Sequence, residues 1–271
     1  MKKIKVKKLK PSTKIFGCIA DPINHVKAPT LFTSEFQRRN IDAIMIPINT
    51  SKNNLKDVIA GLKKIKNFCG LTVTIPHKID IIKYCDKVEL EANQTGAVNW
   101  VKFKDNMLIG NNFDGLGFIT GLNKSNIQLS NKSVCIFGAG GSGMAISFAL
   151  LKHNIKELKI VNRDKVKALQ LVKRLKKFFP ESRLKIEEFN DPVISDSDII
   201  INATSIGLKG NQGIPFNVMK TKKNCLIADI IMDPEETLLI KEAKRLKKQV
   251  HLGKNMLENQ IDLVGMYFKL W

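Results

Sequence analysis

Two charged side chains and one glycine-rich segment are the parts of this chain that could do chemistry. Lys78 follows the segment 70–76, which predicts an apolar strand that ends at a proline. Asp114 lies in a glycine-flanked turn, and segment 138–143 lies between an apolar strand and an apolar helix. A lysine oriented by an aspartate can move a proton at an oxygen, and a bound dinucleotide can exchange hydride at the adjoining carbon. Together they predict hydride transfer between an alcohol and a ketone.

The segment 138–143 has the glycine spacing of a dinucleotide-binding loop. Its glycines are Gly138, Gly140, Gly141 and Gly143. Glycine permits a tight turn and a close approach of the backbone to a pyrophosphate, and a helix that begins there presents amide groups to phosphate. We therefore predict a dinucleotide site, with a purely structural turn as the alternative.

The end of the next predicted strand favours NADP over NAD as the cofactor. An NAD site usually has an acidic residue at this strand end, where it binds the ribose hydroxyls. This chain has the neutral Asn162 followed by Arg163, a cation suited to a 2′-phosphate, while Asp164 follows directly and could oppose that charge. The alternative interpretation of Arg163 is a surface arginine at a strand–helix turn.

Strands alternating with helices predict an α/β fold with two lobes. In the first lobe the apolar runs predict strands at 15–19, 43–48 and 71–75, with helices at 31–39 and 55–65. In the second lobe they predict strands at 133–137, 158–161, 198–202 and 226–230, with helices at 143–152 and 166–178. The alternation indicates mostly parallel sheets, and the second lobe is expected to be of the Rossmann type.

The glycine cluster after Asp114 predicts the boundary between the lobes. We expect a substrate-binding domain over residues 1–114 and a dinucleotide-binding domain over residues 115–254. A closing helix over residues 255–271 is expected to join the first domain. The basic residues 1–10 alternate lysine with apolar residues, and they predict an irregular first strand rather than a targeting peptide.

The chain has a formal net charge of +20, and lysine supplies most of the positive charge. Clusters of arginine with interleaved aromatic residues, which are typical of nucleic-acid contacts, do not occur in the sequence. We therefore expect a solvated lysine surface, no nucleic-acid partner, and some attraction for anionic small molecules. No apolar run reaches membrane-spanning length, so no membrane partner is expected.

The cysteines indicate a reducing compartment. There are five, they are scattered, and none forms a CxxC pair or a metal-type spacing with histidine. We expect a cytoplasmic protein without a metal site, either a monomer or a homodimer.

Short motifs along nearly the whole chain resemble those of the shikimate dehydrogenase family, and they occur in the same order. They are 21–25, 73–78, 96–99, 112–115, 138–143, 162–163, 202–207 and 253–260. The resemblance implies that Lys78 and Asp114 form the catalytic pair. It implies that the substrate hydroxyls are contacted by Thr74, Asn99 and Gln260. It also implies that the cofactor is contacted by Asn162, Arg163, Thr204, Ser205 and Gly253.

Each of these assignments has a structural alternative. Asn99 and Thr204 could cap strand ends, Gln260 could be an exposed helix residue, and Thr74 could fill a strand position. Function has alternatives as well. A non-catalytic metabolite-binding regulator on the same fold stays open, although it would not need both Lys78 and Asp114. A nucleic-acid binder is a third class, and only the net charge suggests it.

The pocket departs from the family where the substrate carboxylate is expected to bind. The family usually has two serines at the positions of Val26 and Ala28, and a tyrosine at the position of Met232. Where the family usually has an asparagine, this chain has Thr72. Where the family usually has a threonine before the aspartate, this chain has Phe113. We expect a polyhydroxy substrate whose carboxylate is absent, modified or bound elsewhere, with Thr72 or lysines as compensating donors otherwise. Shikimate itself stays open.

Overall fold

The computed structural model describes residues 9–189 and 194–271, which form two compact units. The first unit comprises the described residues up to Glu89, together with Val98–Asn111 and Gly265–Trp271. The second comprises Leu90–Ala97 and Asn112–Val264. The strand predicted over residues 1–10 lies, apart from its last two residues, outside the described residues.

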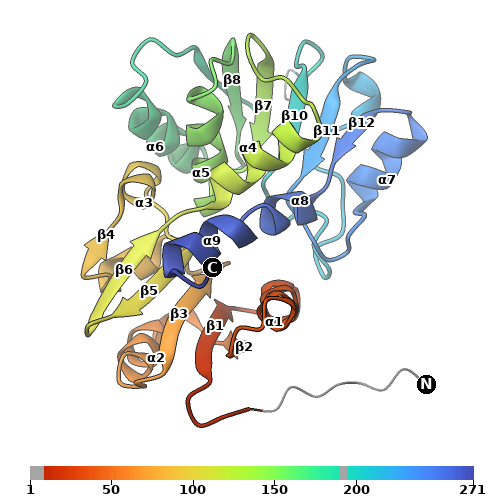
Figure 1. Cartoon of the computed structure of the whole chain (residues 1–271). Coiled ribbons are helices and arrows are strands. Elements are labelled where there is room, and N and C mark those ends of the chain that lie inside the picture. Colours follow the sequence, from red (N-terminus) through yellow and green to blue (C-terminus); the bar gives the residue numbers. More distant parts are fainter. Residues whose placement is uncertain (1–8, 190–193) are drawn as a thin grey trace, which may run out of the picture. The chain divides into compact units, whose positions relative to one another are not determined.

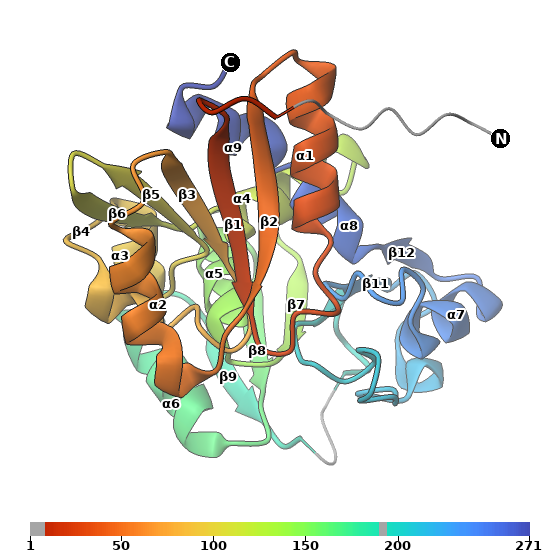
Figure 2. The same cartoon turned by 90° about the horizontal axis from the view of Figure 1, so that it is seen from below.

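The first unit is built on a mixed six-stranded sheet in the order β2-β1-β3-β5-β6-β4. Its strands are β1 Lys14–Ala20, β2 Ala43–Asn49, β3 Phe68–Val73, β4 Lys87–Val88, β5 Trp100–Lys104 and β6 Met107–Asn111. Its helices are α1 Ala28–Arg38 and α2 Leu55–Leu62, with 3-10 turns η1 Lys52–Asn54 and η2 Asp80–Tyr84. β1 pairs in parallel with β2 and β3, whereas β5 runs antiparallel to β3 and β6. Figure 2 shows β1 between β2 and β3, with α1 beside β2.

Aromatic side chains form much of the core of this unit. Phe16 of β1 contacts Phe36 of α1 and Phe268, each with ring centroids 5.2 Å apart. Trp100 of β5 lies edge-on to Phe32 of α1 at 5.0 Å. Such pairs add to the free energy gained from buried area. They hold β1, β5 and α1 together and so place the loops at the carboxyl ends of β1 and β3.

The second unit is a parallel six-stranded sheet in the order β12-β11-β10-β7-β8-β9. Its strands are β7 Ser133–Phe137, β8 Glu157–Val161, β9 Leu184–Glu187, β10 Ile199–Asn202, β11 Leu226–Asp229 and β12 Gln249–His251. Its helices are α3 Leu90–Thr95, α4 Asp114–Lys124, α5 Gly141–Leu151, α6 Lys165–Lys176, α7 Leu238–Arg245 and α8 Gly253–Glu258, with the 3-10 turn η3 Val218–Lys220. This is the strand order of a dinucleotide-binding Rossmann sheet, and Figure 1 shows it from β8 through β7 to β12.

Both faces of this parallel sheet are buried, which explains its continuous apolar strands. Ile136 of β7 packs in the core that α4, α5 and α6 cover. Phe137, the next residue, packs on the other face with Leu239 and Ala243 of α7. Successive side chains of β7 therefore pack into two different cores, one on each face of the sheet. The loop after β7 lies at the carboxyl edge of the sheet.

Two parts of the fold differ from the sequence predictions. The glycines expected to mark a lobe boundary lie inside α4, because the helix packs closely against neighbouring backbone. A Cβ on Gly115 would lie 2.5 Å from the Ala145 oxygen of α5, and one on Gly117 would lie 2.5 Å from the Met256 oxygen. The single closing helix is also wrong: the structure has α8 and then α9 Ile261–Phe268, with Gln260 between them.

The packing of α4 predicts opposite outcomes for two glycine-to-alanine substitutions. Gly115→Ala should lower the free energy of unfolding by roughly 1–3 kcal/mol because its Cβ would overlap backbone that cannot rotate away. Gly61→Ala in α2 should raise it by about 0.5–1 kcal/mol, because alanine favours the helix and no neighbouring atom lies within 4 Å of the new Cβ. Urea unfolding followed by circular dichroism measures both. Equal effects would contradict the close approach at Gly115.

Candidate functional site

Lys78 lies in a turn that follows β3 in the first unit. The carbonyl of Lys78 accepts from the Val98 amide at 2.8 Å, and the amide of Thr74 donates to Ile19 of β1 at 3.1 Å. The lysine is 9% exposed. Burial raises the pKa of the neighbouring Cys18 thiol to about 12, and the charge of Lys78 acts against this rise. The lysine is thus held in an ordered turn beside the carboxyl ends of β1 and β3.

His77, which precedes the lysine, has a structural role in this turn. Its side chain is fully buried, and its Nε2 lies 2.7 Å from the Thr50 oxygen. Burial lowers the pKa of His77 below its ordinary value, so the neutral ring is favoured. The histidine therefore ties the turn that contains Lys78 to the loop after β2.

The predicted substrate residues of the first unit cluster at the same edge of the sheet. Thr72 donates its hydroxyl to the Asn99 carbonyl at 3.1 Å, and the Val73 amide donates to the same carbonyl at 2.8 Å. Asn99 is buried and Thr74 is half-buried. Because the proton of Thr72 is used inside the protein, Thr72 is a poor compensating donor for a carboxylate.

Two of the departures from the family lie where α1 begins. Ala28 is the first residue of α1, and Val26 precedes it by two residues. Lys27 is the N-cap and makes no side-chain capping bond. Neither Val26 nor Ala28 has a hydroxyl, so the side chains at these two positions cannot donate to an anion.

Asp114 begins α4 in the second unit and is 2% exposed. Its Oδ2 accepts from the Ser142 hydroxyl at 3.2 Å, and its Oδ1 accepts from the Gln260 amide at 3.3 Å. Asn112 supports the same turn, since it accepts from the Asp114 amide at 3.0 Å and donates to the Ala97 carbonyl at 2.8 Å. Gln260 is buried and not the exposed helix residue that the sequence left open.

The glycine loop between β7 and α5 has the geometry that a pyrophosphate requires. Gly138 has φ +109°, and its Cβ would lie 2.6 Å from the Ala203 oxygen. A Cβ on Gly143 would lie 2.1 Å from the Gly138 oxygen. Both glycines are therefore required by the fold. Gly140 is different, because no neighbouring atom lies within 4 Å of the position of its Cβ. Gly140 leaves open space at the start of α5, beside Gly141, where helix amides attract phosphate.

Two of the three residues after β8 make structural hydrogen bonds, and the third is exposed. Asn162 accepts from the Ala139 amide at 3.0 Å and so supports the glycine loop. Asp164 caps α6 by accepting from the amides of Val166 and Lys167. Arg163 is exposed, and no ion pair within residues 9–189 and 194–271 involves it. The helix amides offset the charge of Asp164, so it opposes Arg163 less than the sequence implied.

The loop after β10 is shaped by a buried polar network. The side-chain oxygen of Asn202 accepts hydrogen bonds from the amide and the hydroxyl of Thr204, at 3.1 and 2.7 Å. Asn202 also donates to Asp229 at 3.2 Å, and Thr237 donates to the other oxygen of Asp229 at 2.7 Å. Thr204 therefore takes part in the turn at the end of β10, which agrees with the strand-end cap named as its structural alternative, while Ser205 beside it is exposed. Burial raises the pKa of Asp229 to about 6.

Met232 and Gly253 lie at the carboxyl edge beyond β11. Met232 is half-buried in the turn after this strand. Gly253 starts α8, and a Cβ there would lie 2.4 Å from the Ile231 oxygen. Close packing therefore explains the glycine without a ligand.

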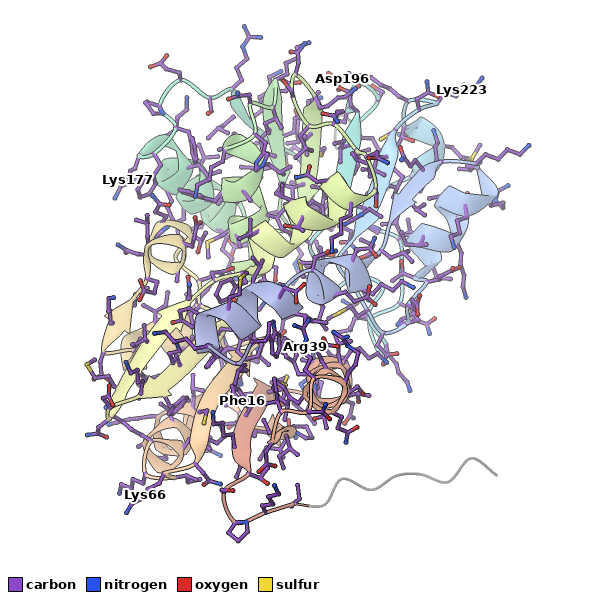
Figure 3. The ribbon with its side chains drawn as sticks, viewed as in Figure 1. Phe16, Arg39, Lys66, Lys177, Asp196 and Lys223 are labelled. Atoms are coloured by element: carbon purple, nitrogen blue, oxygen red, sulfur yellow. The ribbon has the colours of Figure 1, made fainter. Side chains whose placement is uncertain are left out.

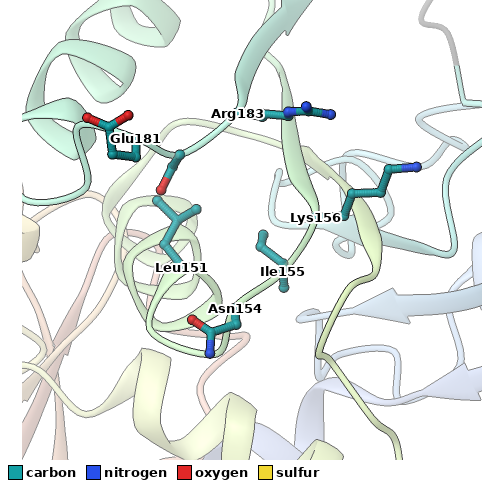
Figure 4. Close-up of a pocket in the computed structure, with 7 residues that line it drawn as sticks. Leu151, Asn154, Ile155, Lys156, Glu181 and Arg183 are labelled. Carbon is teal, nitrogen blue, oxygen red and sulfur yellow. The ribbon is translucent and has the colours of Figure 1, made fainter.

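Of two hollows in the second unit, one lies away from these loops and the other reaches them. One, of about 330 Å³, is lined by Leu151, Asn154, Ile155, Lys156, Glu181, Ser182 and Arg183 (Figure 4). It lies where β8 and β9 begin, whereas ligands of open parallel sheets bind where strands end. Another, of about 370 Å³, includes Gly207 and Pro234 at the carboxyl edge. In the part of the chain that the structure describes, no cluster of metal-binding side chains occurs, and no helix has the length and apolarity needed to cross a membrane.

Comparison with known proteins identifies the family. Residues 18–101 match the shikimate dehydrogenase substrate binding domain, and residues 121–231 match the shikimate/quinate 5-dehydrogenase domain. A shikimate dehydrogenase (NADP(+)) of Methanosphaera stadtmanae is 39% identical over 92% of this chain and 88% of its own. The chain belongs to the shikimate dehydrogenase family.

Solved structures of the family agree with the fold. A shikimate dehydrogenase in complex with NADP+ is 33% identical, with a TM-score of 0.88, over 97% of this chain and 91% of that one. A ligand-free 5-ketofructose reductase of Gluconobacter is 29% identical, with a TM-score of 0.82, over 94% of this chain and 92% of that one. The two-lobe α/β fold predicted from the sequence is confirmed.

Among the residues that matter here, sequence reasoning missed Ser142 and Asp229. Ser142 lies inside the recognised glycine loop, at a position where the motif accepts any residue. Asp229 is the first residue of the family segment that contains Met232. Only the structure shows that Ser142 donates a partly buried hydrogen bond and that Asp229 accepts a buried one.

The buried Asp229 predicts a pH-dependent stability difference. Because its pKa is raised from 3.8 to about 6, the folded chain binds more protons there than the unfolded chain between these values. Its contribution to stability therefore falls as pH rises through this window. Asp229→Asn keeps the shape without the charge. The free energy of unfolding of this variant relative to the parent should rise by up to roughly 3 kcal/mol from about pH 4 to about pH 7.

Urea unfolding of parent and variant at each pH measures this difference, and other titrating groups cancel in it. A difference that stays constant with pH, or that falls, would contradict the raised pKa of Asp229.

Proposed function

We propose that this protein is an NADP-dependent dehydrogenase that reversibly converts a secondary alcohol to a ketone on a shikimate-like cyclic polyhydroxy substrate. Membership of the shikimate dehydrogenase family supports the reaction class. The observation that carries the proposal is the buried carboxylate of Asp114, whose two oxygens accept hydrogen bonds from Ser142 and Gln260 beside a dinucleotide loop. A regulator that only bound a metabolite would not require this arrangement.

In this proposal Lys78 and Asp114 act together on the proton of the alcohol. Lys78 accepts the hydroxyl proton during oxidation and returns it during reduction, since an amine in a mostly buried turn can exchange protons with an oxygen. Asp114 orients Lys78 and stabilises its positive charge. NADP, when bound, accepts hydride from the carbon or supplies it.

The residues of the second unit fit NADP. Gly140 leaves room for a pyrophosphate at the start of α5. Arg163 is exposed at the end of β8, where a 2′-phosphate is recognised in this fold. The Methanosphaera stadtmanae relative is named as an NADP(+) enzyme, and the solved relative with a TM-score of 0.88 is a complex with NADP+, so both support the same cofactor. Thr204 and Ser205 border the cofactor's adenosine side in this proposal, and Gly253 lies near its nicotinamide.

The substrate proposal separates hydroxyl contacts from the carboxylate contact. Thr74, Asn99 and Gln260 are proposed to contact substrate hydroxyls. Val26 and Ala28 offer no hydroxyl to a carboxylate, and the proton of Thr72 goes to a backbone carbonyl. One solved relative is named a 5-ketofructose reductase, and a ketosugar has no carboxylate, which supports such a substrate on this fold. We therefore propose a polyhydroxy substrate whose carboxylate is absent, modified or weakly bound.

The exposed lysines support a surface that is in contact with solvent. Lys66, Lys177 and Lys223 are exposed, and Figure 3 shows their side chains extending away from the ribbon. We propose a solvated lysine surface without a nucleic-acid partner, and a monomer or homodimer. The five cysteines are free thiols, which supports a cytoplasmic location.

Removing either catalytic group should abolish most turnover. Lys78→Ala and Asp114→Ala should each lower kcat by about 10²–10⁴-fold, the usual contribution of acid–base catalysis. NADP binding should be nearly unchanged in both. Steady-state kinetics on the best substrate and a fluorescence titration of NADP measure the two effects. Lys83→Ala, an exposed lysine nearby, is the matched control. Parental turnover in either catalytic variant would remove its assigned role.

Arg163 should make NADP bind more tightly than NAD. A hydrogen bond between charged groups contributes about 1.5–3 kcal/mol, which corresponds to a preference of about tenfold or more. Arg163→Ala should weaken NADP binding by this factor and leave NAD binding little changed. Arg183→Ala removes an exposed arginine at the opposite edge of the sheet and should change neither. An equal loss for both cofactors would place Arg163 outside the phosphate site.

Shikimate should be a poor substrate compared with polyhydroxy compounds without a carboxylate. Two missing hydrogen bonds to a charged group remove roughly 3 kcal/mol or more, over a hundredfold in binding. NADP reduction should be screened over shikimate, quinate, aminoshikimate and simple polyols. Val26→Ser combined with Ala28→Ser should lower the KM for shikimate at least about tenfold and leave the KM for the polyols unchanged. A sub-millimolar KM for shikimate with high turnover in the parent would refute this substrate proposal.

A further inference from the structure

The carboxylate of Asp114 at the start of α4 accepts hydrogen bonds from two other parts of the chain. Ser142 belongs to the first turn of α5, and Gln260 lies between α8 and α9. Their hydrogen bonds reach different carboxylate oxygens, at 3.2 and 3.3 Å. Because the two bonds approach from different elements, they restrict rotation of the carboxylate about its side-chain bonds.

The bond from Ser142 exists because two helices approach within backbone contact. Gly115 follows Asp114, and a Cβ there would lie 2.5 Å from the Ala145 oxygen of α5. Without a side chain at residue 115, the first turns of α4 and α5 come close enough for the serine hydroxyl to reach the carboxylate. A larger residue at this position would separate the helices.

Ser142 also lies inside the dinucleotide loop. Its neighbours Gly141 and Gly143 belong to the turn whose amides bind phosphate in this fold. The amide and the hydroxyl of this residue therefore serve different purposes. The amide belongs to the start of α5, and the hydroxyl donates to Asp114.

We propose that Ser142 is a positioning residue that fixes the carboxylate of Asp114 and links its orientation to the cofactor loop. This inference rests on the proposed role of Asp114 in catalysis. It predicts that loss of the Ser142 hydroxyl lowers turnover without weakening cofactor binding. A purely structural serine would lower stability and leave turnover of the folded protein unchanged.

The test compares three single variants of the full chain. Ser142→Ala removes the hydroxyl and keeps a good helix former, whereas Ser142→Thr keeps the hydroxyl. Ser147→Ala is the matched control, because it removes a buried serine hydroxyl of the same helix that has no hydrogen-bond partner among the described residues. Measurements are kcat, KM and the NADP dissociation constant, with melting temperature to verify folding.

The expected result is a roughly tenfold fall in kcat for Ser142→Ala, with KM and NADP affinity within about twofold of the parent. Ser142→Thr should retain most of the turnover, and Ser147→Ala should match the parent. Unchanged kcat in Ser142→Ala would overturn the inference. Weaker NADP binding with unchanged kcat would also overturn it, since Ser142 would then act on phosphate alone.

A double variant separates this inference from the proposed function. In an Asp114→Asn background, Ser142→Ala should cause little further loss, because a residue that acts through Asp114 has nothing left to position. A full additional loss in that background would overturn the inference and leave the role of Asp114 intact. Parental turnover in Asp114→Asn alone would instead refute the proposed function.

Discussion

The proposed active centre depends on the close approach of helix backbones around Asp114. Gly115 lets α4 meet the Ala145 carbonyl of α5, and Gly117 lets it meet the Met256 carbonyl of α8. These contacts bring Ser142 and Gln260 to the two oxygens of one buried carboxylate. Such hydrogen bonds offset the loss of water that accompanies burial of a polar group. The glycines thus determine the electrostatics of the centre as well as its packing.

A second constraint acts on the loops at the carboxyl edge of the parallel sheet. Gly138 approaches the Ala203 carbonyl, so the loops after β7 and β10 contact each other beside the topological switch point. Asn202 and Thr237 then join these loops to Asp229 below them. The raised pKa of Asp229 indicates what this network costs in stability near neutral pH. Loop geometry for a dinucleotide is maintained here at the expense of a buried charge.

The glycine loop and seven strands could be predicted from the sequence because they follow local rules, whereas β4, β5, β6, β9 and β12 were missed. The strand predicted at 133–137 has the same bounds in the structure, since an apolar run followed by a glycine turn leaves few alternatives. The helix α4 was missed because glycines usually interrupt helices. Here they are needed because α4 packs closely against backbone atoms of α5 and α8. The hydroxyl bond of Ser142 was missed for the same reason. In each case the decisive partner is distant in sequence.

The central claim is that Lys78 and Asp114 perform one chemical task, although they belong to different units of the structure. The most direct test is a double-mutant cycle on kcat/KM with Lys78→Ala, Asp114→Asn and the double variant. Groups that act as one unit are strongly non-additive, so the double variant should lose little more activity than the worse single variant. Losses that multiply in the double variant would show two independent tasks and contradict the account.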